Sequence, residues 1–241
     1  MANAMNIIAV VSQKGGTGKS TVSSNLAVAA SLAGRRTLVA DTDPQASLVD
    51  WKRLRQVRDP LVLAAKSAAI HPMRFAAERA NMDLMIIDTR ASSLDCALEA
   101  AKIAHLTLIV VRPNAVDLRA TAATVEALKP LRRACAFVLN QAPGQRVGRE
   151  PSLVSDAIQL LLDFGLPVAP VALRNRAVYQ HAFARGAAPQ ELEPMGRAAA
   201  EVSRLWAYVE SRLVQPVEAA VGRPRRFVPS FVDQMHPAPA P

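Results

Sequence analysis

The sequence predicts an α/β protein whose doubly wound, mostly parallel sheet is flanked by helices. Short apolar runs alternate with longer, Ala-rich stretches of helical character along the 241 residues. This alternation is typical of parallel strands joined by crossovers. The apolar runs contain no regular polar positions, so both faces of the sheet must be covered. Glycine-rich or acidic segments follow several runs, at the strand ends where this fold class holds its ligands.

The first half of the chain contains strands predicted from the apolar runs and helices predicted from the stretches between them. Gly34 ends the first helix, because glycine commonly stops a helix at such a position. The elements predicted here are strand 7–11, helix 20–33, strand 36–40, helices 46–58 and 72–81, strand 84–88 and helix 94–103.

Proline and glycine divide the second half of the chain. Pro113 ends a strand, and Gly144, Gly148 and Pro151 mark a loop. The elements predicted here are strand 106–111, helix 116–129, strand 134–139, helix 152–164, a last strand at 167–173, and helices 175–185 and 190–213. Residues 1–215 are predicted to form one domain, and the Pro-rich residues 216–241 a mostly disordered tail.

The composition indicates a core of small aliphatic residues and a polyanionic partner. Hydrophobic residues make up 51% of the chain but aromatic residues only 4%. The 29 Lys and Arg residues exceed the 20 Asp and Glu residues, which gives a net charge of +9. A charge of this size favours nucleic acid or an anionic membrane surface as the partner. Charge that merely solubilises the protein is the alternative, because the basic residues are not gathered in one run.

The sequence also predicts a cytoplasmic location. Residues 5–11 are too short for a secretory signal and lack its basic region. No apolar stretch reaches the ~18–20 residues that a transmembrane helix requires. Cys96 and Cys135 show no C-x-x-C spacing, so we expect reduced core residues rather than ligands of an iron–sulfur cluster.

The segment 13–21, Gln-Lys-Gly-Gly-Thr-Gly-Lys-Ser-Thr, predicts a phosphate-binding loop. It lies between the first predicted strand and the first predicted helix, which is the context that such a loop requires. Glycines allow backbone N–H groups to surround phosphate oxygens, and the helix dipole adds positive charge. Gly18-Lys19-Ser20 is the core of the Walker A pattern, but Gln13 replaces its first glycine. A second lysine, Lys14, precedes Gly15-Gly16, and since one lysine suffices for a bound triphosphate, Lys14 needs another role.

This loop resembles the deviant Walker A motif of the ParA/MinD family, ATPases of the SIMIBI class of P-loop NTPases. The family's other motifs follow in order, Asp41-Thr42-Asp43-Pro44-Gln45 after the second strand and 84–88 at the end of another. The resemblance covers about residues 6–215 and is closest to the small partition ATPases, because no DNA-binding extension precedes the first strand. It implies a weak ATPase that forms a homodimer when ATP is bound. Each Lys14 would then reach the nucleotide held by the other subunit.

The resemblance implies ATP and Mg²⁺ as cofactors and assigns catalytic roles. Lys14, Lys19 and Asp43 form the catalytic set: Lys19 offsets phosphate charge and Asp43 orients the attacking water. Ser20 and Asp88 are expected Mg²⁺ ligands, and Asp41 supports the metal site. The expected cradle around the phosphates consists of Gly15, Gly16, Thr17, Gly18, Lys19, Ser20 and Thr21.

The base of the nucleotide has its own expected contacts. Asn140 follows a strand, at the place where the family reads the adenine edge, and Pro170 is expected to pack on the ring. Unaided by the resemblance, an Asn after a strand is more often a turn former. One departure from the family follows Asp88, where Thr89-Arg90 replaces the usual prolines and resembles the branch of the VirC ATPases. This departure bears on how hydrolysis is coupled to partner binding.

Four arginines of the C-terminal third are the expected contacts to non-specific DNA, which implies association with the nucleoid: Arg174, Arg176, Arg197 and Arg204. Arg197 and Arg204 are one heptad apart, so they share a helix face. In the family such residues are gathered from both subunits by the ATP-bound dimer. Arginines that only solvate an exposed helix are the alternative.

The sequence therefore predicts an ATP-gated switch that carries a plasmid, a chromosome region or a protein cargo, with a small ParB-like or cargo-adaptor protein as partner. One alternative is a MinD-like regulator bound to a membrane through residues 223–235, although Pro224 and Pro229 interrupt any helix there. A VirC-like ATPase of DNA transfer is a second alternative. A metabolic enzyme that activates a small substrate is a third, which Lys14 and Asp43 argue against.

Overall fold

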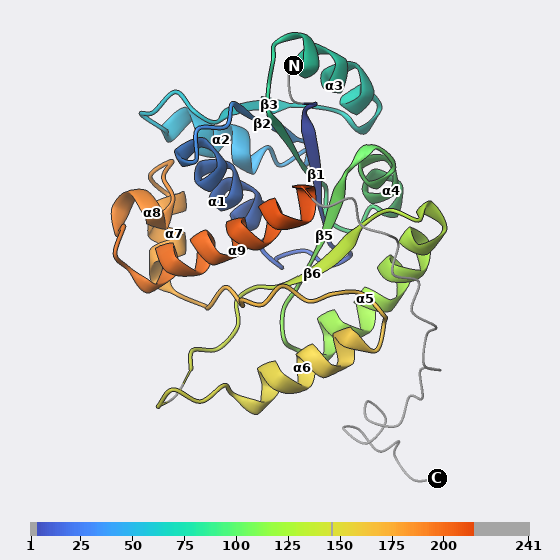
Figure 1. Ribbon diagram of the computed structural model, residues 1–241, viewed down its shortest axis with the longest axis vertical. Coiled ribbons are helices and arrows are strands. Elements are labelled where there is room, and N and C mark those ends of the chain that lie inside the picture. The colour runs from blue at the N-terminus through green and yellow to red at the C-terminus, as the bar shows by residue number, and fades with distance from the viewer. Residues whose placement is uncertain (1–3, 146, 215–241) are drawn as a thin grey trace.

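A computed structural model describes residues 4–145 and 147–214 of the chain. Six parallel strands form one sheet in the order β3-β2-β4-β1-β5-β6 (Figure 1). The strands are β1 Asn6–Val11, β2 Thr37–Asp41, β3 Leu61–Ala64, β4 Leu84–Asp88, β5 Leu106–Val111 and β6 Cys135–Leu139. The predicted doubly wound parallel sheet is confirmed. The predicted tail at 216–241 lies outside the described residues.

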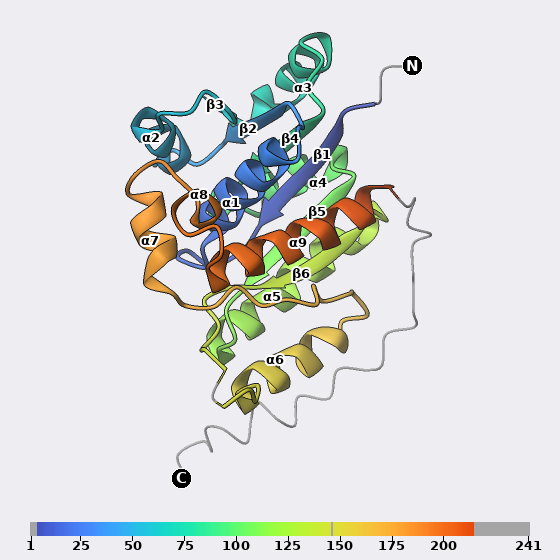
Figure 2. The same cartoon turned by 60° about the vertical axis from the view of Figure 1, so that its left-hand side comes forward.

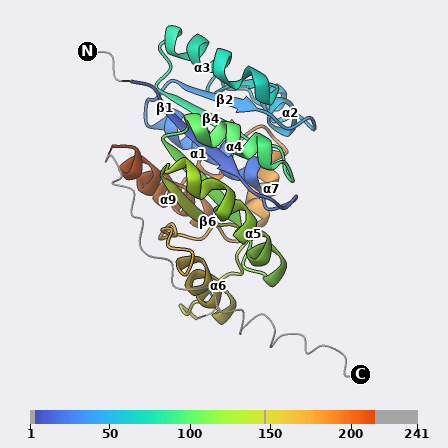
Figure 3. The same cartoon turned by 90° about the vertical axis from the view of Figure 1, so that its right-hand side faces the viewer.

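Helices cover both faces of the sheet. The helices are α1 Lys19–Leu32, α2 Ser47–Leu54, α3 Ile70–Arg79, α4 Leu94–Ile103, α5 Ala115–Leu128, α6 Ser152–Leu162, α7 Ala177–Phe183, α8 Pro189–Leu192 and α9 Arg197–Val214. Residues of α1, α2, α7 and α9 pack against one face, where α9 lies along α1 (Figure 2). Residues of α3 to α6 pack against the other face (Figure 3).

The strands are buried on both sides, which explains their unbroken apolar sequences. On β1, Ile8 and Val10 enter the core under α1 and α9, whereas Ile7 and Ala9 enter the core under the opposite helices. These four side chains are fully buried. Burial of a large aliphatic side chain stabilises the fold by roughly 1.5–3 kcal/mol, so the central strands need no polar positions.

Three elements differ from the prediction. Strand β3 was not predicted, because it has only four residues at a sheet edge and three of them are exposed. Residues 167–173, predicted as a last strand, form only one isolated bridge with β6, between Val168 and Phe137, because Pro167 and Pro170 cannot donate backbone hydrogen bonds. The helix predicted at 190–213 is divided into α8 and α9, because the chain turns between Glu193 and Gly196.

Helix α2 is fastened at its far end to the turn before α8. The Arg55 guanidinium donates to both carboxylate oxygens of Glu191, at 2.6 and 2.8 Å, and to the carbonyl of Gly186 at 2.9 Å. It also lies over the ring of Trp51, which contacts the ring of Phe183 on α7. A Cβ at Gly186 would lie 2.4 Å from the Arg55 backbone nitrogen, so the two segments are in direct backbone contact.

The strand register gathers the expected site residues at one edge of the sheet. Asp41 at the end of β2 is aligned with Asp88 at the end of β4. Asp88 is in turn aligned with Val10 of β1, just before the glycine-rich loop. Strands β5 and β6 end beside them, at Val111 and Leu139. Segments far apart in sequence therefore meet around the loop that follows β1.

Candidate functional site

The glycine-rich loop opens the N-terminus of α1 toward solvent. Gly18 precedes the helix at φ 87° and no side chain caps the first turn, so its N–H groups are available to an anion. A Cβ at Gly18 would lie 2.1 Å from the Asn140 side-chain nitrogen, so another residue would displace Asn140 and would also be strained at this φ. The Thr17 hydroxyl is buried without a hydrogen-bond partner among the described residues. These features fit a bound phosphate chain.

The two lysines of the loop occupy opposite environments. Lys19 is 6% exposed, and burial lowers the pKa of its ammonium against the opposing effect of Asp88 and Asp43. Lys14 is exposed, and no ion pair of Lys14 occurs within the part of the chain that the structure describes. Lys19 is therefore enclosed beside the carboxylates of the site, whereas the Lys14 side chain extends to the surface.

Asp88 receives two hydroxyl hydrogen bonds from α1. Ser20 donates to one carboxylate oxygen at 2.7 Å and Ser23 to the other at 2.8 Å. Burial raises the pKa of Asp88 to about 7, although both hydroxyl bonds oppose the shift. A hydroxyl and a carboxylate are oxygen ligands of the type Mg²⁺ prefers when it keeps several waters. The predicted pair Ser20 and Asp88 thus lie together, and Ser23 is an addition that its position three residues after Ser20 could have indicated.

Asp41 holds the start of α2 rather than facing the loop. One carboxylate oxygen accepts the N–H of Leu48 at 2.9 Å and of Val49 at 3.3 Å, and the other accepts the N–H of Asp43 at 3.2 Å. Burial raises the pKa of Asp41. Its expected support of a metal site stays a prediction. Sequence alone did not indicate this capping role.

Asp43 is half-buried and lies within electrostatic reach of Lys19. Its carboxylate accepts the N–H of Gln45 at 3.0 Å, and its carbonyl accepts the N–H of Ala46 at 2.8 Å. Ala46 has φ 50°, which disfavours a residue with a Cβ. The turn from 43 to 46 is thus a strained connection beside the loop.

Two amides of the segment after β6 hold the loop from the other side. Asn140 donates to the Thr17 carbonyl at 2.7 Å and Gln141 to the Gly16 carbonyl at 3.0 Å. Both border a hollow of about 520 Å³ that begins at Thr21 and is walled by α7 through Tyr179, Gln180 and Phe183. The Asn140 amide oxygen is left to accept, and its expected contact with the adenine edge stays a prediction. Gln141 and the α7 residues were missed, because no motif marks them.

Pro170 lies away from this hollow. It borders a second depression of about 800 Å³ between α6 and α9, together with Val154, Ile158 and Arg204. The structure therefore does not place Pro170 beside Asn140, and the expected packing on a base ring is not supported. The reason is that Pro170 follows Ala169, whose N–H bonds the Phe137 carbonyl in the middle of β6, so Pro170 lies alongside the strand and not at its end.

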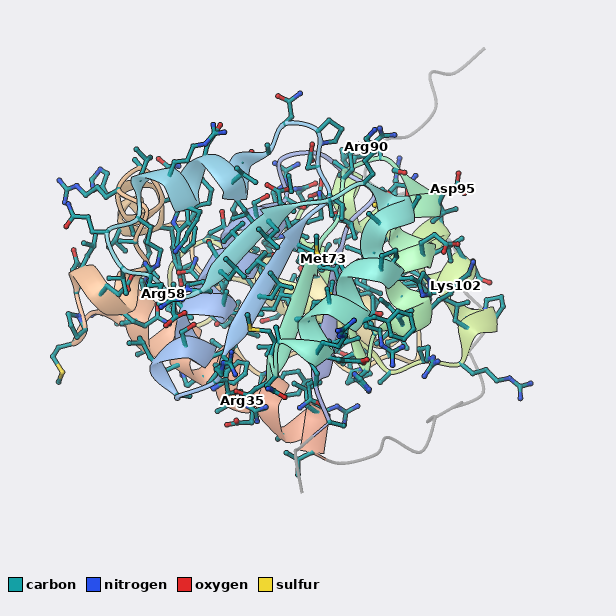
Figure 4. All side chains as sticks on the ribbon, turned by 90° about the horizontal axis from the view of Figure 1, so that it is seen from above. Arg35, Arg58, Met73, Arg90, Asp95 and Lys102 are labelled. Carbon is teal, nitrogen blue, oxygen red and sulfur yellow. The ribbon has the colours of Figure 1, made fainter. Side chains whose placement is uncertain are left out.

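The segment after Asp88 is joined to the glycine-rich loop. Thr89 is buried and bonds the Val10 carbonyl, whereas Arg90 is exposed and lies at the margin of the molecule in Figure 4. The Ser92 N–H and hydroxyl both donate to the carbonyl of Gln13 at 3.1 Å. A movement of this segment would therefore displace Gln13, the residue next to Lys14.

The four arginines expected to contact DNA fall into two pairs. Arg174 donates to both carboxylate oxygens of Glu150, and Arg176 to one oxygen of Glu201, at 2.6 to 2.9 Å. Glu201 is buried and also accepts from Tyr179. Arg174 and Arg176 thus hold the fold through these ion pairs, and a contact of either with DNA stays a prediction.

Arg197 and Arg204 are exposed on one face of α9 and make no ion pair within the described residues.

Cys96 and Cys135 are buried free thiols, as predicted. Within residues 4–145 and 147–214, no helix is long and apolar enough to cross a membrane.

Comparisons with known proteins agree with this geometry. Residues 8–189 match the model of the CobQ/CobB/MinD/ParA nucleotide binding domain. The maintenance of carboxysome distribution protein A of Halothiobacillus neapolitanus is 32% identical over 207 residues, covering 80% of this chain and 91% of that protein.

Two solved structures share the fold. MinD of Pyrococcus horikoshii, a septum site-determining protein complexed with Mg-ADP, is 21% identical and superposes with a TM-score of 0.69 over 89% of this chain and 99% of its own. Apo McdA of Cyanothece is 15% identical with a TM-score of 0.71, over 87% and 99% of the two chains. With a family model matching most of its length, this chain belongs to the CobQ/CobB/MinD/ParA nucleotide-binding domain family.

Proposed function

We propose that this chain is an ATPase that forms a homodimer around bound ATP and Mg²⁺ and positions a large cargo. The contrast between its two loop lysines carries the proposal. Lys19 is buried against Asp88, while Lys14 is exposed without an ion pair among the described residues. A lysine left free beside a phosphate loop fits a role in a second subunit.

The residues of the site would share the chemistry as follows. The loop N–H groups and Lys19 would bind the phosphates, and Ser20 and Asp88 would hold Mg²⁺, which supplies positive charge against the triphosphate when bound. Asp43, on the strained turn before α2, would orient the attacking water. Phosphoryl transfer asks mainly for positioning and electrostatics, so this small set is sufficient.

Cargo and DNA binding belong to the same proposal. The relative from Halothiobacillus neapolitanus is named for carboxysome distribution, which favours a protein assembly over a plasmid or chromosome region as cargo, reached through an adaptor protein. Arg197 and Arg204 are the side chains that would contact DNA, because they are exposed and share one face of α9. Phosphate contacts of this kind carry no sequence preference.

The experiment compares three variants by analytical ultracentrifugation and nucleotide titration. Lys19→Ala should lose ATP binding, and Lys14→Ala should keep monomer ATP binding but lose the ATP-dependent dimer. Lys102→Ala, near the end of α4 where the chain enters β5 at the sheet edge opposite the loop, is the matched control and should do neither. Equal loss of ATP binding in the two loop variants would refute the role of Lys14 in the second subunit.

The membrane alternative rests on residues outside the described part of the chain. Co-sedimentation with anionic vesicles and with duplex DNA, each with ATP and with ADP, separates it from the proposal. ATP-dependent sedimentation with DNA alone supports the switch proposed here. Sedimentation with vesicles alone would favour the MinD-like reading.

A further inference from the structure

Arg112 lies between β5 and α5, beside the glycine-rich loop. Its Nε donates to one carboxylate oxygen of Asp117 at 2.7 Å and its Nη2 to the other at 3.0 Å. The Asp117 side chain is 2% exposed, and its backbone N–H is held by the Asn114 side chain at 3.0 Å. The pair is therefore bidentate and fixed by the first turn of α5, which makes it stronger than a single-point contact.

Asp117 and Lys14 line the same narrow crevice, together with Gln13, Ala120 and Thr124. A carboxylate and an ammonium near each other attract, and the attraction is strong where water is partly excluded. Here Lys14 makes no ion pair among the described residues, and the charge of Asp117 is already neutralised by Arg112, which binds both of its oxygens.

The remaining nitrogen of the guanidinium adds to this effect. A Cβ built on Gly16 would lie 4.0 Å from Arg112 Nη1, so the positive charge also lies against the loop itself. Nη1 has no hydrogen-bond partner in the part of the chain that the structure describes. A like charge at this place disfavours a Lys14 side chain that folds back toward α5.

We propose that Arg112 is a positioning residue that keeps Lys14 free for the second subunit by neutralising Asp117. Without the guanidinium, Asp117 would capture Lys14 within its own chain, and the lysine would have to be released before it could cross an interface. The effect on dimerisation rests on the proposed function, whereas the capture of Lys14 by Asp117 would occur within a single chain. Lysine at position 112 would not replace arginine fully, because an ammonium cannot bind both oxygens in the same fork geometry.

The first test measures Lys14 directly, in the nucleotide-free monomer. Pulse acetylation with mass spectrometry gives the labelling rate of each lysine, and an ion-paired lysine labels more slowly because its pKa is raised. Lys102 and Lys129, which pair with Glu99 and Glu126, provide internal references for an exposed, paired lysine.

The expected result is that Arg112→Gln slows labelling of Lys14 by about 5-fold, toward the paired references, as for an ion pair near a surface. The double variant Arg112→Gln with Asp117→Asn should restore the wild-type rate, and Asp117→Asn alone should leave it unchanged. Local loosening of α5 would speed labelling instead, so an unchanged or faster rate in Arg112→Gln overturns the proposal. If that variant does not fold, Arg112→Lys takes its place and must show slower labelling than wild type.

The second test measures ATP-dependent dimerisation by analytical ultracentrifugation. Two lysines cross the interface, so Arg112→Gln should weaken the dimer by up to about 25-fold, and the double variant should recover it. A wild-type chain that never dimerises would refute the proposed function, while the labelling rates would still decide whether Arg112 protects Lys14.

Discussion

We expect the affinity for DNA to fall steeply as the salt concentration rises. Of the four arginines first considered, only Arg197 and Arg204 are exposed without ion pairs among the described residues. A dimer would therefore present four such side chains. The perturbation is Arg204→Glu, which removes one phosphate contact per subunit and leaves the nucleotide residues untouched.

The magnitude follows from counterion release. Four neutralised phosphates give a slope of about −3.6 in log affinity against log salt, so binding should weaken about 150-fold between 50 and 200 mM salt. Arg204→Glu leaves two contacts, and the same change in salt should then cost only about 12-fold. Affinity at low salt should also fall.

Gel-shift or anisotropy titrations at both salt concentrations, with a non-hydrolysable ATP analogue and with ADP, measure these slopes. Arg79→Glu is the matched control, because it makes the same charge change on α3, under the opposite face of the sheet. Arg174→Glu should instead lower the melting temperature, since it breaks the pair with Glu150. A slope that Arg204→Glu does not change, or retention that does not depend on nucleotide, would refute the reasoning.

Three further outcomes are expected. Asp43→Ala should still bind ATP and should accumulate as a dimer in ultracentrifugation, because the pocket remains while the chemical step is lost; a monomeric variant would contradict its assignment. Gly18→Ala should abolish nucleotide binding in a fluorescent-nucleotide titration, whereas Gly34→Ala, which has a similar φ of 82° but nothing within 4 Å of its Cβ, should only lower stability by about 1 kcal/mol. His105 accepts the N–H of Ile7, and its pKa is lowered by burial and by nearby arginines, so the folded state favours the neutral ring and stability should fall as pH drops below about 6.5. Urea unfolding at pH 7.5 and 5.5 tests this, and His105→Gln should show a smaller loss; an equal loss would assign the effect to other groups.

Local chemistry explains which parts of the site were predictable. Lys14, Lys19 and Ser20 belong to one continuous segment whose spacing itself carries the chemistry, and Asp88 ends a fully buried strand. The contacts of Gln141 and Ser92 with the loop join residues more than seventy positions apart. No pattern along the chain marks such contacts, because they depend on which strands become neighbours.

The same limit applies to the unpredicted strand β3 and to the ion pairs of the arginines. A four-residue edge strand such as β3 buries too little to produce a periodic pattern. Arg174 and Arg176 have the same charge as Arg197 and Arg204, and only the positions of Glu150 and Glu201 separate structural from free arginines. The composition gives the number of these charges, but it does not show which of them are paired with a carboxylate in the fold.

The anchoring of α2 has a mechanical consequence. Asp41 fixes the first turn of this helix and Arg55 fixes its end to the turn that follows α7, so α2 cannot tilt on its own. Any displacement that starts at Asp43 must be absorbed by a hinge of a few residues around the left-handed Ala46, or else move α2 and α7 together. In the second case Phe183, which touches Trp51, carries the motion to the far wall of the hollow next to Thr21. The turn at Asp43 and the hollow beside Thr21 would then be coupled through α2 and α7, as well as through any ligand that contacts both.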